Sequence, residues 1–257
     1  MFTPVERERV RSVLMDLARG DDRITGGAIT GSASLGQEDP WSDIDLAFGV
    51  RKASEIAPTL VDFSERMYRD HHALDHLDVT SGAWIYRVFL LPSTLQVDLA
   101  FAPEAEFGAR APTFRLAFGN ATGKPPASPP PERLIGLAWL YALHARSSMA
   151  RGKLWQAEYM ISSMRDQVLA LACRRHDLPF QEARGIDRLP REIRVPLEGS
   201  LVGSLDPSEL GHAFGVTAAA LISEVRFTDQ ALAHRLEPIL RELADTPGTP
   251  PGEWHSP

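Results

Sequence analysis

The segment Ile24–Val50, ITGGAITGSASLGQEDPWSDIDLAFGV, contains two short apolar runs joined by a polar connection. Both runs are bounded by turn-forming residues, which is typical of β-strands. Gly31 and Ser32 follow the first run, and Asp43 and Asp45 stand at the start of the second. Because alternate residues of a strand face the same side, the two aspartates are expected to project together from one face of a sheet.

Two carboxylates this close repel each other, so one of them takes a proton or a cation lies between them. Mg²⁺ suits the second arrangement because it joins carboxylates to substrate phosphates. Gly31 lets the backbone approach an anion closely, and amides at a helix start together with the Ser32 hydroxyl can hold phosphate oxygens. The segment therefore predicts a magnesium site beside a phosphate site. The alternative is a surface turn in which Asp43 and Asp45 are simply solvated.

A third carboxylate, Asp98, lies in the apolar run LQVDLAF. A lone charge is costly to bury in such a strand. If this strand lies beside the strand that begins at Asp43 and Asp45, Asp98 becomes a third metal ligand or a general base.

Residues 1–118 alternate between helical and strand patterns. Helices are expected at 5–19 and 55–70, the first with a buried stripe of Val5, Val10, Val13, Leu14 and Leu17. Two further runs, 83–91 and 94–101, are separated by Pro92-Ser93 and suit a hairpin. Helices interspersed with strands, some joined by a tight turn, indicate an α/β sheet that is not purely parallel.

Gly119–Pro131, GNATGKPPASPPP, has five prolines and is interpreted as a linker between two domains. Residues 132–244 are expected to form a helical domain, and the tail 245–257 to be disordered. The helix at 153–175 has a core-facing stripe of Ala157, Ile161, Met164, Val168 and Leu171. Near its end lies the single cysteine, Cys173, which is interpreted as a buried structural thiol.

Charge and hydropathy exclude several classes of protein. The net charge of −7 argues against a large nucleic-acid surface. No apolar run reaches membrane-spanning length, and the N-terminus lacks the apolar stretch of a signal peptide, so a cytoplasmic location is expected. Residues 1–123 contain 18 acidic and 12 basic residues, whereas 124–257 contain 16 and 15. The excess of carboxylates thus belongs to the first half.

The order Gly-Ser, ten residues, Asp-x-Asp and a later Asp resembles the nucleotidyltransferase superfamily that includes DNA polymerase beta. Within it, GSASLG…WSDIDLAF is similar to the aminoglycoside and lincosamide nucleotidyltransferases. The resemblance implies a mixed-sheet α/β (α+β) nucleotidyltransferase domain followed by an α-helical bundle. It also implies Mg²⁺-dependent transfer of a nucleoside monophosphate, AMP from ATP, to a hydroxyl of a small molecule such as an antibiotic.

The run 150–165, ARGKLWQAEYMISSMR, resembles the helix that antibiotic nucleotidyltransferases place over the nucleotide. The resemblance implies that Glu158 deprotonates the acceptor and that Lys153 contacts phosphate. An exposed helical glutamate in a salt bridge explains Glu158 equally well.

The acceptor stays open at this point. The second half of the chain is nearly neutral. This argues against a polycationic aminoglycoside as the acceptor, because a pocket for such a drug should be lined with carboxylates. Three acceptors remain open: a lincosamide, an unrelated metabolite and a protein hydroxyl. Transfer to a protein hydroxyl would make the chain an antitoxin-like AMP transferase. The alternative to an enzyme is a non-catalytic nucleotide-binding protein of the same fold.

Overall fold

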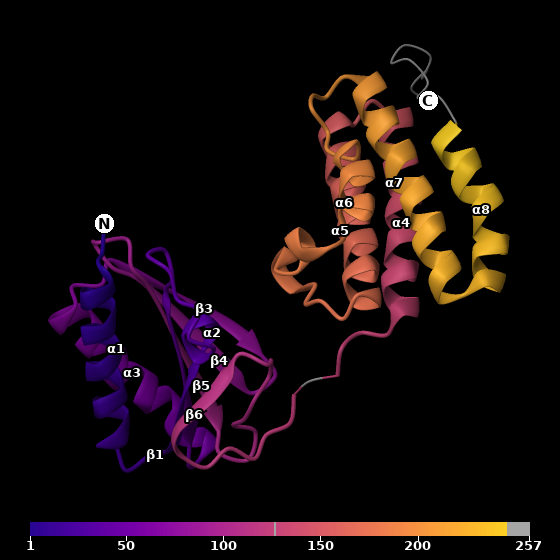
Figure 1. Cartoon of the computed structure of the whole chain (residues 1–257). Coiled ribbons are helices and arrows are strands. Elements are labelled where there is room, and N and C mark those ends of the chain that lie inside the picture. Colours follow the sequence, from indigo (N-terminus) through magenta and orange to yellow (C-terminus); the bar gives the residue numbers. More distant parts are fainter. Residues whose placement is uncertain (126, 246–257) are drawn as a thin grey trace, which may run out of the picture. The chain divides into compact units, whose positions relative to one another are not determined.

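The computed structural model describes residues 1–125 and 127–245. It divides into two compact units, Met1–Ala127 and Ser128–Pro257, called here the first and second units (Figure 1). The tail expected to be disordered lies outside the described residues from position 246 onward.

The first unit is built around a six-stranded sheet in the order β3-β4-β5-β2-β1-β6. β2 and β5 run parallel, and every other neighbouring pair is antiparallel. The predicted mixed sheet is therefore confirmed. Its elements are α1 (Pro4–Arg19), β1 (Ile24–Thr30), α2 (Gly31–Ser34), β2 (Ile44–Val50), η1 (Ala53–Glu55), α3 (Ile56–Asp70), β3 (Asp75–Ser81), β4 (Trp84–Leu90), β5 (Gln96–Pro103) and β6 (Phe114–Gly119).

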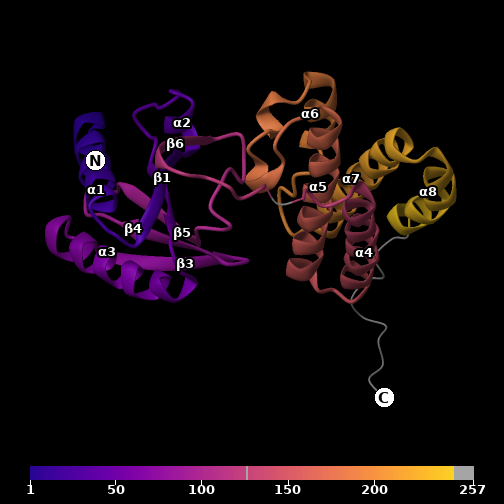
Figure 2. The ribbon, with the colours of Figure 1, turned by 90° about the horizontal axis from the view of Figure 1, so that it is seen from below.

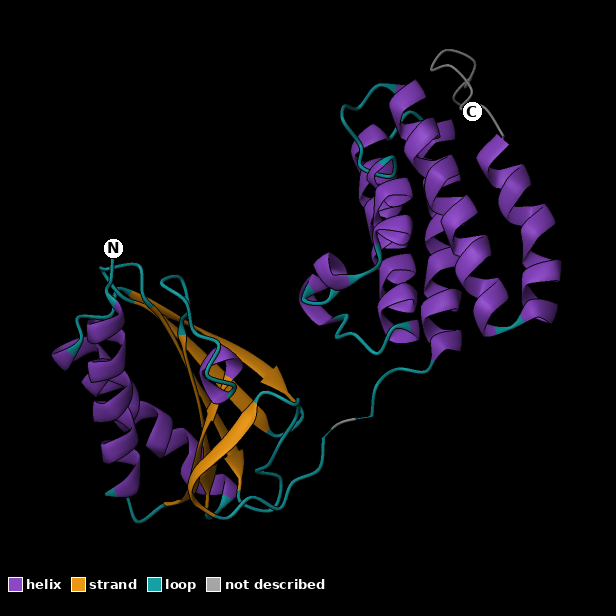
Figure 3. Cartoon of the chain, viewed as in Figure 1, coloured by secondary structure: helices purple, strands orange, loops and turns teal. Residues whose placement is uncertain are grey.

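Helices α1 and α3 lie on the same face of the sheet (Figures 2 and 3). The core beneath them is aromatic at its centre, where Phe63 of α3 packs against Phe48 of β2 and Phe101 of β5 with ring centroids 5.6 and 5.3 Å away. All three rings are at most 1% exposed. This core fixes which face of each central strand points away from the helices.

Two edge strands were not predicted. β3 reads DHLDVTS and is mostly exposed, and β6 forms the opposite edge of the sheet directly before the proline-rich segment. An edge strand pairs on one side only and buries fewer side chains, so its sequence lacks the apolar signal of a central strand.

The predicted buried stripe of α1 is partly wrong. Val5 and Val13 are 79% and 48% exposed, whereas Arg7 and Arg11 are only 5% and 6% exposed. The helix therefore turns a face that contains two arginines toward the protein. Hydrophobic periodicity cannot anticipate this, because it assigns charged residues to the solvent side.

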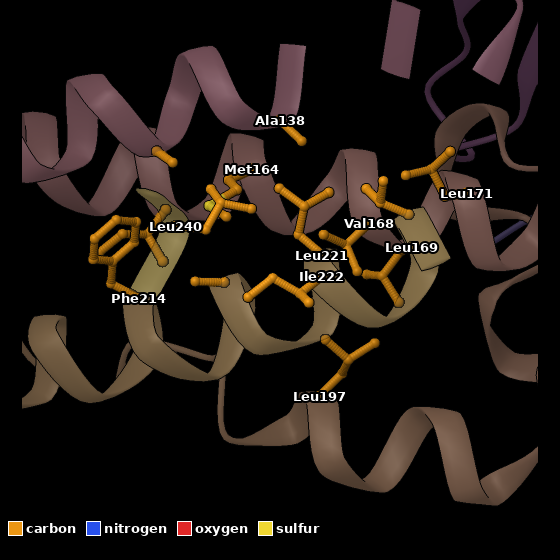
Figure 4. Close-up of a cluster of buried hydrophobic side chains, with 14 of the residues drawn as sticks. Ala138, Met164, Val168, Leu169, Leu171, Leu197, Phe214, Leu221, Ile222 and Leu240 are labelled. Carbon is orange, nitrogen blue, oxygen red and sulfur yellow. The ribbon is translucent and has the colours of Figure 1, made fainter. Parts of the chain in front are cut away.

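The second unit is helical, as predicted. Its elements are α4 (Pro131–Ala150), α5 (Leu154–Arg175), η2 (Gln181–Ala183), η3 (Ile186–Arg188), α6 (Arg191–Glu198), α7 (Pro207–Thr228) and α8 (Gln230–Asp245). Met164 and Val168 of α5 meet Leu221 of α7 and neighbouring side chains in one apolar cluster (Figure 4). The whole predicted stripe of α5 and Cys173 are buried. Short α6 was not predicted.

Within the described residues, no helix combines the length and the apolar character that a membrane crossing requires.

Phe63→Ala should lower the free energy of unfolding of the first unit by about 3–5 kcal/mol, because it removes the ring at the centre of the aromatic core. Val61→Ala is the matched control, since Val61 lies on the same helix and is 52% exposed. Urea denaturation followed by pulsed hydrogen exchange of β2 and β5 peptides separates this unit from the helical one. Equal losses in the two variants would contradict the packing described.

Candidate functional site

The site is built on the face of the sheet opposite α1 and α3, called here the carboxylate face. Asp45 of β2 and Asp98 of β5 are register partners in the parallel pair. Adjacent strands lie about 4.8 Å apart, and register partners point to the same side. The flanking Ile44, Leu46 and Leu99 are at most 1% exposed in the core beneath the helices. The two carboxylates therefore project together, away from that core.

Asp43 lies directly before β2 and not within it, contrary to the prediction that the strand contains both aspartates. Its Oδ2 accepts a hydrogen bond from Nε2 of Gln96, the first residue of β5, at 3.3 Å. Asp43 thus contacts the start of β5 through its side chain, whereas its backbone lies outside the strand ladder.

Gly31 connects the Gly-Ser turn directly to Asp45. It has φ +60°, and a Cβ built on it would lie 1.9 Å from Asp45 Oδ2. Two features therefore require a glycine at this position: the left-handed backbone and the closeness of the Asp45 carboxylate. Ser32 follows in the one-turn helix α2 and is half-buried. The structure brings Gly31 and Ser32 to the edge of the carboxylate face.

The fit of a metal ion depends on the donors that the carboxylate face offers. Within 1–125 and 127–245, no three His, Cys, Asp or Glu side chains form a group that could hold one. Magnesium, however, commonly uses one or two protein carboxylates and completes its octahedron with substrate phosphates and water. Asp45 and Asp98, side by side in register, fit that requirement.

Apolar residues continue the carboxylate face toward the β3 edge. One cross-strand row runs from Asp98 through Val88 of β4 to Leu77 of β3. Leu77 is 65% exposed, and Val79 in the next row is 49% exposed. In the row of Asp98 the side chains in this direction are therefore hydrocarbon, whereas the row of Gln96 runs through Leu90 to Asp75.

Tyr86 and Arg110 were missed by sequence reasoning. Burial raises the pKa of the half-buried Tyr86, the nearby Asp98 carboxylate raises it further, and Arg110 opposes the shift. The Arg110 guanidinium lies 5.3 Å from the centre of the Trp84 ring and donates to Ser81 Oγ at 3.1 Å. If the pairing of β4 with β5 had been known, alternation along β4 would have placed Tyr86 on the side of Asp98. No pattern in the sequence indicates Arg110.

Lys153 and Glu158 belong to the second unit. Lys153 is exposed at the N-cap position of α5, and Glu158 accepts a hydrogen bond from Ser162 Oγ at 2.6 Å, one turn along the helix. Trp155 and Tyr159 on the same stretch are 78% and 64% exposed. The beginning of α5 therefore combines a cation, a carboxylate and two accessible aromatic rings.

The first unit is thus a mixed α/β sheet domain with an acidic pair beside a Gly-Ser turn. No protein-family model and no curated protein matches the chain. Among solved structures, the chain is similar to an aminoglycoside 6-adenyltransferase from Bacillus subtilis, with 14% identity, 96% of this chain and 100% of that chain covered, and a TM-score of 0.41. At that TM-score the likeness decides neither the fold nor the function of this chain.

Gly31→Ala should displace Asp45, and Gly36→Ala is its matched control. Gly36 has φ +66°, but a Cβ at this position would meet nothing within 4 Å, so it shares the backbone strain without the clash. The control should cost about 1 kcal/mol of stability, and Gly31→Ala about 1–3 kcal/mol more. Urea denaturation measures both, and Mn²⁺ binding in the presence of ATP reports the carboxylates. Equal behaviour of the two variants would contradict the contact.

Proposed function

We propose that the chain is a magnesium-dependent nucleotidyltransferase that transfers AMP from ATP to a hydroxyl group of a small molecule. The observation that carries the proposal is the register of Asp45 with Asp98 on neighbouring parallel strands, with Gly31 in contact with Asp45. A paired carboxylate site for a cation and a backbone turn for phosphates are thus adjacent, as phosphoryl chemistry on a nucleoside triphosphate requires.

Each part of the site has a role in this reaction. Asp45 and Asp98, with Asp43 directly before β2, would hold one or two magnesium ions, which would neutralise the triphosphate and stabilise the leaving pyrophosphate. Gly31 and Ser32 would hold the β- and γ-phosphates. The acceptor oxygen forms a bond to the α-phosphorus while the bond from that phosphorus to pyrophosphate breaks.

The proton of the acceptor hydroxyl needs a base. Asp98 is one candidate because it stands at the carboxylate face, and Glu158 of α5 is the other. Lys153, five residues before Glu158, would neutralise phosphate charge.

The row of side chains that continues from Asp98 favours an acceptor that is not a polycation. Val88 and Leu77 continue the row of Asp98, and Val79 lies in the next row. A drug with many ammonium groups needs charged partners to offset its desolvation. A hydroxyl compound with an apolar portion, as lincosamides have, suits these side chains better than an aminoglycoside.

A non-catalytic nucleotide-binding protein is the second candidate. It would bind ATP with magnesium and release no pyrophosphate with any acceptor, including a protein hydroxyl. Titration calorimetry run beside a pyrophosphate assay separates the two functions. The pairing of Asp98 with Asp45 favours the enzyme, because nucleotide binding alone does not require the second carboxylate on that face.

Asp45→Asn and Asp98→Asn should each lower pyrophosphate release by about 10²-fold or more, since each removes a charge that a phosphate-bound cation needs. The assay contains ATP, Mg²⁺ and a panel of lincosamides, aminoglycosides and neutral glycosides. Asp75→Asn is the matched control, because Asp75 lies at the β3 edge and is exposed. Near-wild-type rates in both site variants would rule out the metal assignment.

Glu158→Gln should lower the rate of pyrophosphate release by about 10²-fold or more if this residue takes the acceptor proton. ATP binding should stay unchanged, because the amide keeps the shape of the side chain. Ser162→Ala is the control that removes only the hydrogen-bond partner of Glu158. A Glu158→Gln enzyme with full activity would assign the base to Asp98.

A further inference from the structure

The loop 35–43 joins the Gly-Ser turn to the Asp-x-Asp strand. Strand pairing holds Asp45 through its register with Asp98 of β5, and β1 pairs with β2 from Leu46 onward. The pairing of β2 with β5 begins at Ile44, so Asp43 is the first residue beyond the ladder. The position of the Asp43 backbone therefore depends on how the loop is held.

Two buried arginines of α1 hold this loop. Nη1 of Arg7 donates to the carbonyl oxygens of Asp39 at 2.7 Å and Ser42 at 2.8 Å, and its Nε lies 3.1 Å from Glu38 Oε1. Arg11 forms a two-pronged pair with the same Glu38 carboxylate. Arg7, Arg11 and Glu38 are called here the arginine clamp.

The clamp reaches the residue next to Asp43. The carbonyl that Arg7 holds on Ser42 belongs to the peptide group that leads into Asp43. Within the loop, Asp39 Oδ1 accepts from the amide of Trp41 at 2.8 Å and from the Ser42 hydroxyl at 3.0 Å. These hydrogen bonds hold the pKa of Asp39 below its usual range. The turn is thus hydrogen-bonded within itself and also to α1.

Burying two guanidinium groups is costly unless their donors are satisfied. Leucine or methionine at positions 7 and 11 would complete the apolar face of α1 without that cost. A methionine would, however, leave two loop carbonyls without their donor. The guanidinium fork is suited to binding several oxygens in a fixed geometry, which neither lysine nor an apolar residue can do.

We infer that Arg7 and Arg11 are positioning residues for the metal site and act through loop 35–43 on Asp43. The inference rests on the proposed function, since it assigns Asp43 to cation binding. It predicts that the effect of losing Arg7 passes through Asp43 and is therefore absent where Asp43 no longer contributes a carboxylate.

A double-mutant cycle on the full chain tests this, with the affinity for Mn²⁺ in the presence of ATP measured by electron paramagnetic resonance. Arg7→Gln should weaken Mn²⁺ binding by about tenfold, as loss of outer-shell partners commonly does. Arg7→Lys should fall between Arg7→Gln and wild type. In the Asp43→Asn background, Arg7→Gln should cause little further loss. Arg19→Gln, which removes the Arg19–Asp16 ion pair at the other end of α1, should leave Mn²⁺ affinity unchanged.

Hydrogen exchange of amides 36–43 is measured in the same variants. Faster exchange of this loop in Arg7→Gln, with unchanged exchange in β2 and β5, supports the clamp and shows that the domain is still folded. An Arg7→Gln chain with wild-type Mn²⁺ affinity would overturn the inference, as would an Arg7→Gln effect of equal size with and without Asp43. Failure of the wild-type chain to bind Mn²⁺ with ATP would instead overturn the proposed function.

Discussion

The parallel pairing of β2 with β5 is the constraint on which the site depends. Parallel neighbours need a long connection, and here it contains α3, β3 and β4. The register places Asp98 beside Asp45, and a slip of one residue would turn Asp98 into the core beneath the helices. The buried Val97 and Leu99 prevent that slip, because it would bring both to the opposite face. The hydrophobic core thus determines the geometry of the carboxylate pair.

The two faces of the sheet differ in the size of their side chains. The helix side is filled by large rings, whereas Ala28, Ala47 and Ala100 form part of the opposite side. These small residues, with Gly26 and Gly49, let the Phe107 ring approach the backbone so closely that a Cβ at either glycine would lie 2.8 Å from it. One end of the carboxylate face is therefore covered by an aromatic ring, and the partly exposed Asp43 and Gly31 lie toward the other end.

Much of this arrangement could be predicted from the sequence because it follows local rules. Alternation in IDLAF and QVDLAF indicates two strands with one face buried, and the glycine before Ser32 indicates a turn. The partner of each strand could not be predicted, since pairing depends on contacts distant in the chain. The same reason explains why Tyr86 and Arg110 were missed. Tyr86 lies on the side of Asp98 only because β4 pairs with β5, and Arg110 lies in the connection between β5 and β6.

Arg7 and Arg11 illustrate a different limit. A periodic pattern assigns arginine to solvent, yet both arginines are buried, with Arg7 bonded to two loop carbonyls and Arg11 to the Glu38 carboxylate. Whether a buried charge is stable depends on those partners and not on its own sequence neighbourhood. Predicting them would require knowing the path of loop 35–43 in advance. The apolar residues of α1 pack against the core, whereas its buried arginines bind loop 35–43.

The possible roles of Asp98 compete with one another. A carboxylate that shares its charge with magnesium has less affinity for a proton than a free one, so a ligand is a poor base at the same moment. Because Asp45 and Asp98 are the pair that the β2–β5 register brings together, losing Asp98 as a ligand would leave only Asp45 and the less constrained Asp43. A site that keeps Asp98 for the metal would therefore need a base other than Asp98, and Glu158 is the other candidate of the proposed function.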